Sequence, residues 1–508
     1  MADEMKPLPI GAAIGDEVSE SSALSLADVS AGSPNAVAFT EVYFEYISSM
    51  TALQPGMVRG IRVFRLLQRA PWYWLHGKLA KLHGFSEQVS QIDAFLSHSW
   101  HDVGWLKYVN MLYLSNGSFA FWMSTLSSLL AMALFQVGVL PEWRGTLWTY
   151  WNCQWCTIFG ILAHYLTLLL CPRQARVFLD IACIDQRSED DKIAGLVSMG
   201  AVLKSSKSMV VLWCPSYVTR LWCIFELSAF LHSQKTQDLK HRRANLKVCP
   251  PMLGPTLMVT HVSLSVTAMI YLSLRGSFGD STVFIGGAVA IPLFCLTFYS
   301  ARAYFRSIDV LEGEVRNLSI EKCASHCCRE GRPHGGICDR EVILRCIDAW
   351  FGSVSNFDQY AQEKLQMALV DQLADAVFSY PRIIMASAPV LWLALDRAAA
   401  EAQHSLHDAA AALVRFVSWW VAVLPCIANV ILRLSYKLRA HCGSFALEVL
   451  SSLGVVGLAG CLASAFLVLE RRVVWELLPS QLLASLLFLG LTGAVNLCLW
   501  CCLPRFRV

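Results

Sequence analysis

The chain has 508 residues, of which 55% are hydrophobic and 16% are charged. Soluble domains usually carry about 25% charged residues, so this composition predicts a membrane protein whose partners include lipids. The formal net charge is only +3, and we find no basic stripe interleaved with aromatic residues on a soluble segment. Nucleic acid is therefore excluded as an expected partner.

The N-terminal region predicts two different segments. Residues 1–54 begin with acidic residues and lack an apolar core flanked by basic residues, so they predict a disordered polar tail and not a secretory signal. Residues 55–90 contain a basic helical pattern that includes Trp72, Tyr73 and Trp74. We expect a juxtamembrane amphipathic helix there, which either lies on an anionic membrane surface or packs against the spans.

Long apolar windows predict several membrane-spanning helices, since one span needs about 20 mostly apolar residues. We expect a transmembrane hairpin in 119–171, a second in 254–301, and further spans in the C-terminal part, 377–508. One window is weaker because it contains Arg382 and two prolines. The windows are 119–140, 151–171, 254–274, 282–301, 377–395 (the weaker one), 411–432, 446–469 and 481–503.

The loop charges predict the orientation of the spans, because lysine and arginine collect on the cytoplasmic side. Segments 172–253, 302–376 and 433–439 are basic, whereas 141–146 and 275–281 carry little net charge. We therefore expect the first three segments in the cytosol, where 302–376 forms a helical segment that contains cysteines and histidines. Eight spans place both termini in the cytosol, and seven place the C-terminus outside.

Short apolar runs outside the membrane windows predict buried parallel strands, and a helical pattern follows each of them. Alternating strands and helices indicate an α/β fold with a doubly wound parallel sheet. A membrane hairpin separates the first strand from the second, but two crossings return the chain to the side it left. One cytosolic domain can therefore form from 91–118 and 172–253. The predicted strands are 92–97, 175–180 and 208–214, with a further candidate at 244–250.

Three stretches carry a resemblance to a known family. They are DAFLSHSW at 93–100, RVFLDIACIDQ at 176–186 and LKSSKSMVVLWCPSYVTRLWCIFELSAF at 203–230. In order, spacing and residue type they resemble the Toll/interleukin-1 receptor homology (TIR) domain, and the W-C-x-x-E-L block is the most specific. The resemblance covers roughly residues 90–250 outside the membrane insertion. It implies a flavodoxin-like sheet, while the insertion and the missing last strand and helix of the family indicate a divergent member.

Glu226 stands among apolar residues in the helical run 219–230. The resemblance implies a chemical role, because the glutamate at this motif position is the catalytic residue of NAD hydrolysis in enzymatic members of the family. One carboxylate suffices, since nicotinamide leaves as a neutral molecule from a cationic pyridinium, and partial desolvation strengthens its effect on an oxocarbenium-like ribose. The alternative is that Glu226 accepts hydrogen bonds and only anchors its helix.

The carboxyl ends of the predicted strands are expected to line the ligand pocket, as in other doubly wound sheets. The ring of Trp100 can stack on nicotinamide or adenine, or pack over the sheet edge, and Asp102 can equally cap the helix that follows. Asp180 and Asp185 are expected to be loop and turn residues. The residues predicted to bind NAD+ as a substrate are Ser97, Ser99, Trp100, Asp102 and Trp222.

The cysteines and histidines of the segment CASHCCREGRPHGGIC present a second pattern. Cys323 with Cys327, and His326 with Cys328, come close to the spacing of zinc ligands, but the second pair of ligands is less regular. We prefer a reduced cytosolic loop, with palmitoylation as another alternative, so no metal site and no required cofactor are predicted. About half of the nineteen cysteines, such as Cys153, lie in apolar stretches and are expected to act as small hydrophobes.

Three functions compete on this evidence. The leading hypothesis is a multi-pass membrane protein whose cytosolic TIR-like domain signals by assembling with other TIR-like domains, including a homo-oligomer. The second is an NAD+ hydrolase that releases nicotinamide through Glu226. The third is a channel or transporter, which the many spans suggest; against it, few charges lie inside the windows, and His164 and His261 are weak candidates.

Overall fold

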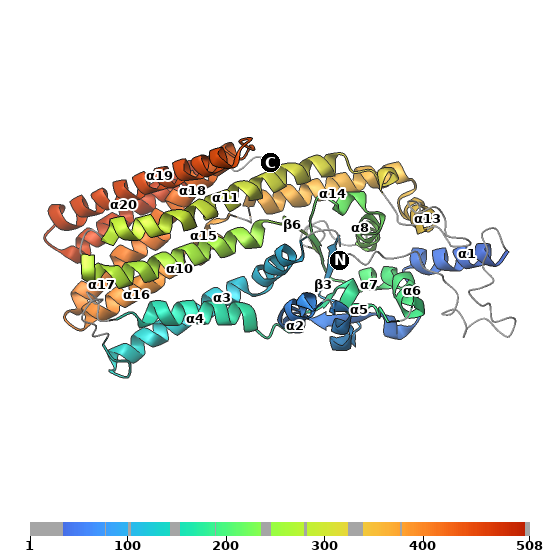
Figure 1. The fold of residues 1–508 in the computed structure, drawn as a ribbon, viewed down its shortest axis with the longest axis horizontal. Coiled ribbons are helices and arrows are strands. Elements are labelled where there is room, and N and C mark those ends of the chain that lie inside the picture. The colour runs from blue at the N-terminus through green and yellow to red at the C-terminus, as the bar shows by residue number, and fades with distance from the viewer. Residues whose placement is uncertain are drawn as a thin grey trace. The chain divides into compact units, whose positions relative to one another are not determined.

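The computed structural model describes residues 34–76, 78–99, 103–142, 153–187, 189–234, 245–278, 282–323, 339–375 and 378–502. The chain divides into two compact units (Figure 1). The first, here called the sheet unit, takes its described residues from 1–107, 172–250 and 310–372. The second, the helical unit, takes them from 108–171, 251–309 and 373–508. Each unit is therefore assembled from three separate stretches of chain.

The sheet unit is built on a six-stranded mixed sheet with the strand order β2-β1-β4-β3-β5-β6. Strands β4, β3, β5 and β6 are parallel, and Phe95 of β3 lies between Phe178 and Met209 of its two neighbours. Strand β1 pairs antiparallel with both β4 and β2. The strands are β1 (Arg59–Arg62), β2 (Ser86–Gln88), β3 (Ala94–His98), β4 (Arg176–Phe178), β5 (Met209–Leu212) and β6 (Leu246–Cys249).

The parallel strands coincide with the short apolar runs of the sequence. Every residue of β5 is buried, and the rings of Phe95 and Phe178 stack with their centroids 4.9 Å apart. Continuous burial of this kind is typical of parallel strands that are covered on both faces. The three predicted strands and the further candidate at 244–250 are thus confirmed as members of one mostly parallel sheet. The two antiparallel strands β1 and β2 were not expected.

Residues 55–90 fold differently from the single amphipathic helix predicted for them. Helix α2 (Val63–Leu75) is flanked by the strands β1 and β2 and by two short 3-10 helices, η2 (Pro55–Met57) and η3 (Leu79–Phe85). Arg62 and Arg176 both form ion pairs with Glu87 of β2, at 3.1 and 2.8 Å. The prediction of one helix is therefore wrong, because Arg62, one of the basic residues of the predicted helix, finds an acidic partner on the sheet.

Helix α1 (Pro34–Ser49) lies inside the predicted disordered tail, so that prediction is wrong for residues 34–49. The helix is fixed to α13 (Asp339–Phe351), where the guanidinium of Arg345 donates two hydrogen bonds of 2.9 Å to Glu41. Trp350 also donates its indole N–H to the carbonyl of Ser48 at 2.9 Å. Residues 310–372 thus belong to the same compact unit as the sheet, and not to a separate segment over 302–376.

The other helices of the sheet unit connect or follow the strands. Helix α14 starts in this unit and continues to Asp375. The remaining elements are α5 (Asp180–Cys183), α6 (Glu189–Val197), α7 (Met199–Lys204), η4 (Tyr217–Thr219), α8 (Leu221–Ser233), η6 (Ile320–Lys322) and α14 (Val354–Asp375).

The helical unit contains long apolar helices. Among the described residues, six helices are long and apolar enough to cross a membrane: Gly104–Gln136, Leu253–Leu272, Ala288–Arg316, Leu406–Lys437, Phe445–Val474 and Gln481–Cys502. A bent pair, with 57° between its two helices, adds a seventh if it counts as one span. These helices support a multi-pass membrane protein. The elements are α3 (Gly104–Gln136), α4 (Trp155–Leu170), α10 (Leu253–Phe278), α11 (Thr282–Arg316), α15 (Tyr380–Ala386), α16 (Ala388–Ala402), α17 (Leu406–Ser418), α18 (Leu424–Lys437), α19 (Phe445–Glu470) and α20 (Gln481–Cys502), with π-helical turns at Trp419–Val423 and Arg471–Leu477.

The insertion between β3 and β4 is an antiparallel pair of helices (Figure 1). Asn116 donates to the carbonyl of Leu168 at 2.8 Å, and Ser128 donates to the carbonyl of Cys156 at 2.8 Å, so the chain leaves along α3 and returns along α4. This return explains how strands on both sides of the insertion reach one sheet. Helix α4 has 16 residues, which is shorter than a regular span, so the second arm of the predicted hairpin does not meet the length of the other candidates.

Helices α10 and α11 form a second antiparallel pair. The hydroxyl of Thr256 contacts the carbonyl of Ser300, and that of Ser263 contacts the carbonyl of Leu293, each at 3.2 Å. Helix α11 continues to Arg316, beyond the predicted end of this hairpin at 301. The polar contacts therefore run along the inside of the pair, and the helix extends further than hydropathy alone indicates.

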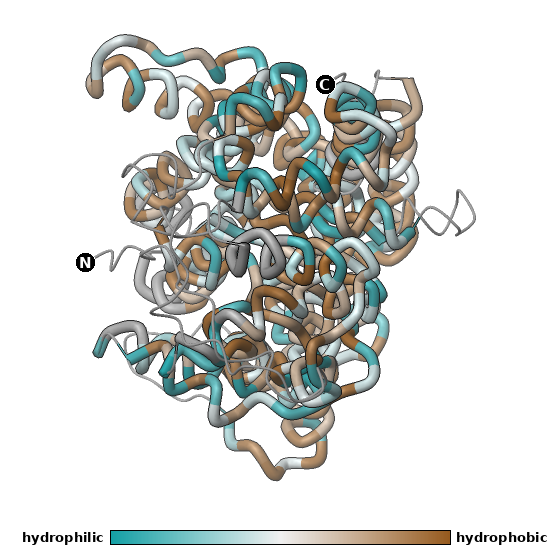
Figure 2. The backbone as a smooth tube through the Cα atoms, turned by 90° about the vertical axis from the view of Figure 1, so that its right-hand side faces the viewer, coloured by the Kyte–Doolittle hydropathy of each residue, from teal (hydrophilic) through white to brown (hydrophobic). Residues whose placement is uncertain are grey.

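Large apolar side chains are exposed on the helical unit, while many small polar side chains are buried in it. Leu450 is 63% exposed and Leu497 is 65% exposed, whereas Ser128 is 0% exposed. Figure 2 shows the hydropathy along the backbone, where brown segments recur among white and teal ones on the helices. An apolar exterior with polar contacts inside is the arrangement expected for helices that pack in lipid.

Candidate functional site

The carboxyl group of Glu226 lies at the carboxyl end of the parallel strands. Ser97, the fourth residue of β3, donates its hydroxyl to Glu226 Oε2 at 2.5 Å, and its oxygen lies 2.7 Å from the hydroxyl of Tyr217. Tyr217 follows β5 and also donates to the carbonyl of Cys223 at 3.3 Å. A hydrogen-bonded group thus joins β3, the segment after β5 and helix α8.

This position is the topological switch point of the parallel strands. The chain runs from β3 to β4 on one side and then to β5 on the other side of β3. Ser97 pairs in register with Val211 of β5, next to the point where the connections diverge. Ligands of open α/β sheets bind outside the carboxyl ends of the strands at such a point. The topology therefore places Glu226 where a ligand site is expected.

Burial dominates the electrostatics of Glu226. Ser97 and Tyr217 are fully buried, and the glutamate side chain is mostly covered. Burial raises the pKa of Glu226 to about 8, because a carboxylate loses solvation there. The hydrogen bond from Ser97 and the charge of Arg220 oppose this shift in pKa, and the negative charge of Asp180 adds to it. The group is therefore mainly protonated at neutral pH and ionises just above it.

A second set of polar contacts extends from the end of β3. The hydroxyls of Ser99 and Ser216 lie 2.7 Å apart, and Lys107 donates its ammonium to the carbonyl of Ser99. Cys223 donates its thiol to the carbonyl of His98 at 3.5 Å. These contacts fix the backbone after β3 against α8 and against the first turn of α3. Residues 98 and 99, which border the candidate site, are therefore held in place.

His98 adds a titratable group to the same end of the sheet. Burial lowers the pKa of His98, and the charges of Lys107 and Arg220 lower it further, while Asp180 acts in the opposite direction. Asp180 and Arg220 thus act on both His98 and Glu226. Clusters of titratable residues with perturbed pKa values are common at functional sites, although structural networks produce them as well.

The structure brings two of the predicted site residues into direct contact. Ser97 and Glu226 are directly bonded, and Ser99 lies two residues further along the chain, in contact with Ser216. Trp222 packs edge-to-face on Phe225, with ring centroids 5.4 Å apart. Trp100 and Asp102 lie outside the described residues. The hydrogen bond that anchors Glu226 comes from Ser97, a residue that had been expected to bind substrate.

The two aspartates near the predicted pocket behave differently from each other. The carboxylate of Asp180 accepts the backbone N–H of Ile181 at 2.8 Å at the start of α5. Asp185 pairs with Arg187 at 2.5 Å, and this guanidinium holds the pKa of Asp185 well below its usual range. Asp185 is thus the turn residue that the sequence predicts.

Sequence reasoning missed Tyr217, Arg220 and Cys223 as parts of this site. All three lie in the stretch that carries the family resemblance, between β5 and Glu226. Tyr217 is fully buried, and its hydroxyl needs polar partners there. The available signal in the sequence was Tyr217, a tyrosine shortly before the apolar helix that contains the lone acid Glu226.

A cavity of about 320 Å³ lies at the other edge of the sheet unit. Its lining includes Ser90, Lys204, Lys207 and Asn245, which precede or flank the amino ends of β3, β5 and β6. This is the edge opposite the one that carries Ser97. The cavity and the Glu226 group are therefore separate features of the sheet unit.

The predicted cysteine and histidine cluster is described only at its ends, because residues 324–338 lie outside the described part. Cys323 is buried and donates its thiol to the carbonyl of Val218 at 3.1 Å. Burial raises the pKa of Cys323 to about 12, and that of Cys346 in α13 to about 12 as well. Both thiols are thus protonated at neutral pH in this arrangement.

The helical unit holds the other polar groups of interest. Among the described residues, one set of metal-ligating side chains lies close together: Cys153, Cys156 and Asp396. His164 of α4 and His261 of α10 stack with ring centroids 3.7 Å apart, and Tyr165 contacts His261 at 2.9 Å. The channel or transporter alternative is suggested by the many spans, and these two histidines are its weak candidates inside the windows.

Comparisons with known proteins add no family to these observations. No protein-family model matches the chain, and neither the curated proteins nor the solved structures yield a match. The resemblance to the TIR domain therefore stays a prediction from the motifs.

Proposed function

We propose that this protein is a multi-pass membrane protein whose sheet unit is a cytosolic TIR-like domain that signals by assembling with other such domains. The observation that carries the proposal is the strand order. Numbered along the chain, the parallel strands β3, β4, β5 and β6 are arranged 2-1-3-4, which is the order of flavodoxin-like sheets. The order matches the fold that the motifs imply, even though membrane helices separate the first two strands.

The Ser97–Glu226 hydrogen bond supports the same proposal. It joins the last motif, W-C-x-x-E-L, to the first, D-A-F-L-S-H-S, across 129 residues of chain. Two motifs that were identified separately in the sequence thus meet at one point in the fold. The antiparallel course of α3 and α4 supports a domain whose two halves lie on the same side of the membrane.

Self-association in the membrane tests the assembly proposal. We expect energy transfer between full-length copies labelled with donor and acceptor dyes in liposomes, and we expect excess unlabelled protein to reduce it. An unrelated multi-pass protein at the same lipid ratio gives the value for random proximity. Energy transfer equal to that value, or insensitive to unlabelled protein, would contradict assembly.

A second candidate function, NAD+ cleavage, is favoured by the position and the pKa of Glu226. A mostly covered carboxyl group with a pKa of about 8 lies at the switch point of the sheet. The cationic pyridinium of NAD+ would favour the carboxylate form, since an opposite charge nearby lowers a carboxyl pKa. The same desolvation strengthens the attraction between the carboxylate and a positively charged ribose in the transition state.

Nicotinamide release from NAD+ tests the enzymatic candidate. Glu226→Gln keeps an acceptor for Ser97 but removes the charge, so release should fall about 10²- to 10³-fold. Glu87→Gln, on the edge strand β2, is the matched control and should retain wild-type release. The wild-type rate should rise as the pH increases through about 8, because the carboxylate is the active form. Release that is absent, or unchanged in Glu226→Gln, would leave Glu226 a structural anchor.

A further inference from the structure

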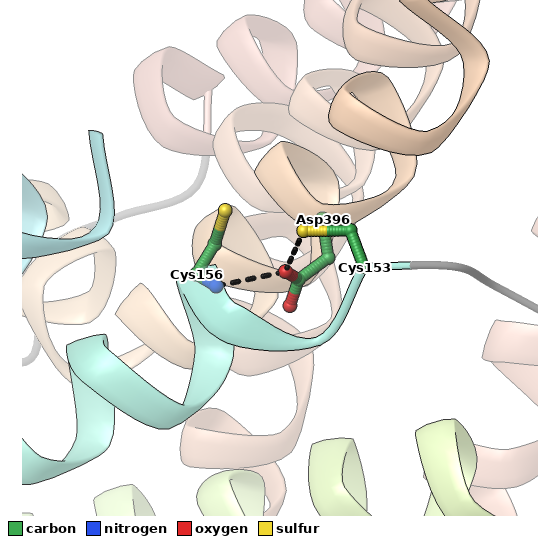
Figure 3. Close-up of side chains that lie close together, drawn as sticks. All are labelled: Cys153, Cys156 and Asp396. Carbon is green, nitrogen blue, oxygen red and sulfur yellow. Dashed lines mark hydrogen bonds between the residues drawn. The ribbon is translucent and has the colours of Figure 1, made fainter. Parts of the chain in front are cut away.

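Two cysteines and one aspartate meet in the interior of the helical unit (Figure 3). Cys153 lies two residues before the first residue of α4, Cys156 lies in the first turn of this helix, and Asp396 comes from α16, 240 residues after Cys156 in the chain. The two sulfur atoms and a carboxylate oxygen all lie within 4.8 Å of one another. The arrangement therefore combines a C-x-x-C motif with an acid from a distant helix.

Helix capping accounts for part of this arrangement. The carboxylate of Asp396 accepts the backbone N–H groups of Cys156 at 2.8 Å and Thr157 at 2.9 Å. These are among the first N–H groups of α4, which lack partners within the helix, and an acid is favourable at this end. Capping explains the carboxylate, but it does not require two thiols. Cys153 contacts the same carboxylate through its sulfur at 3.3 Å.

Within the described part of the chain, no basic side chain balances the charge of this site. Cys153, Cys156 and Asp396 are all 0% exposed, and no lysine, arginine or histidine in the described part of the chain forms an ion pair with Asp396. The surrounding cluster contains Phe135, Leu395 and other apolar residues, which keep water away. A buried carboxylate without a cation is costly, and an apolar shell strengthens the binding of a metal ion.

We propose that Cys153, Cys156 and Asp396 bind a thiophilic divalent cation such as Zn2+. Two thiolates and one carboxylate supply three of the four ligands that zinc usually takes, and two cysteines with two residues between them are a common half of such sites. Binding releases the two thiol protons, so a cation of charge +2 faces three negative ligands next to the N–H groups of α4. This site lies outside the sheet unit and goes beyond the proposed signalling and NAD+ functions.

Metal binding by the full-length protein in nanodiscs tests the proposal. After removal of metal by a chelator, under reducing conditions, the protein should bind Zn2+ in competition with a chromophoric chelator, and Co2+ should give a thiolate charge-transfer band. Cys153→Ser and Cys156→Ser should each weaken Zn2+ binding at least tenfold and reduce that band. Cys171→Ser, which changes a buried thiol at the other end of α4, is the matched control and should bind as the wild type does.

Asp396→Asn removes the anionic ligand and should bind Zn2+ at least tenfold more weakly. Its amide oxygen still accepts one of the two N–H groups of α4, whereas the other N–H group loses its acceptor, so unfolding of this variant is measured alongside Zn2+ binding. A measurement on the wild type covers the case in which a cysteine variant does not fold: X-ray absorption by the Zn2+-loaded protein should show sulfur ligands on the zinc. Equal Zn2+ binding by the wild type and all three variants, or bound zinc without sulfur ligands, would overturn the proposal.

Discussion

The two units each contain a buried carboxyl group, but they satisfy it in different ways. In the sheet unit, Glu226 accepts one side-chain hydrogen bond from the described residues, from Ser97. In the helical unit, Asp396 accepts two backbone N–H groups and one thiol. One neutral hydroxyl thus meets Glu226, whereas the N-terminus of α4 presents several donors to Asp396. The comparison teaches that two covered acids can be held by different kinds of donor.

Breaking the buried ion pair of the helical unit should have the largest effect on stability. Arg302 is 0% exposed and pairs with Glu448 at 2.7 Å. Arg302→Ala leaves Glu448 buried with less compensation, and we expect a loss of about 3–5 kcal/mol in the free energy of unfolding. Thermal and denaturant unfolding in micelles would measure it. Arg472→Ala, which affects an exposed pair with Glu476, is the control and should cost less than about 1 kcal/mol. Equal effects would contradict the buried role of Arg302.

Filling the close helix contact at Gly160 should have the next largest effect. A Cβ atom at Gly160 would lie 2.4 Å from Trp392 Cδ2 and 2.5 Å from Ser128 Oγ, so Gly160→Ala forces α3, α4 and α16 to shift. We expect a loss of about 1–3 kcal/mol from overpacking, measured by the same unfolding experiments. Gly457→Ala meets no atom within 4 Å and should leave stability unchanged or raise it slightly. If Gly160→Ala left the free energy of unfolding unchanged, helices α3, α4 and α16 would pack less closely than the structure shows.

The pH dependence of the sheet unit should report the environment of Glu226. Its pKa is raised from an ordinary value of 4.5 to about 8, so the folded state holds a proton that the unfolded state releases. The associated stability is fully present below pH 4.5 and is lost as the pH rises to about 8, with a slope of at most about 1.4 kcal/mol per pH unit. Glu226→Gln should flatten the change in unfolding midpoint over this range. An unchanged slope would show that other groups titrate there.

Removing an exposed ion pair of the sheet unit should have the smallest effect. Lys207 and Asp93 pair at 2.7 Å, with side chains 52% and 41% exposed. Because water and salt screen such a pair, Lys207→Ala should change the free energy of unfolding by less than about 1 kcal/mol, and the change should shrink as salt is added. Ser97→Ala, which removes the buried donor to Glu226, should cost about 1–3 kcal/mol and serves as the reference variant in the same unit. A larger effect for Lys207→Ala than for Ser97→Ala would reverse the expected order.

Local sequence patterns were sufficient to predict those elements whose secondary structure hardly depends on the segments that pack against them. The run MVVL of β5 is a strand in any covered sheet, and the apolar stretch of α19 is a helix in any lipid-like surrounding. The same reasoning failed at β1, where the charged run RGIR looked like part of a surface helix. It forms a strand because Arg62 meets Glu87 and Gly60 lies close to β4, and these partners are distant in sequence.

The sequence by itself determined the membrane character, three of the parallel strands with the fourth as a candidate, and Glu226 as an acid that required an explanation. These follow from hydropathy and from residue periodicity, which act over a few residues at a time. Only the tertiary structure decided which donor meets Glu226, that residues 310–372 join the sheet unit, and that Asp396 faces the pair Cys153 and Cys156. Those outcomes depend on contacts between segments more than one hundred residues apart, and a local pattern carries no information about such contacts.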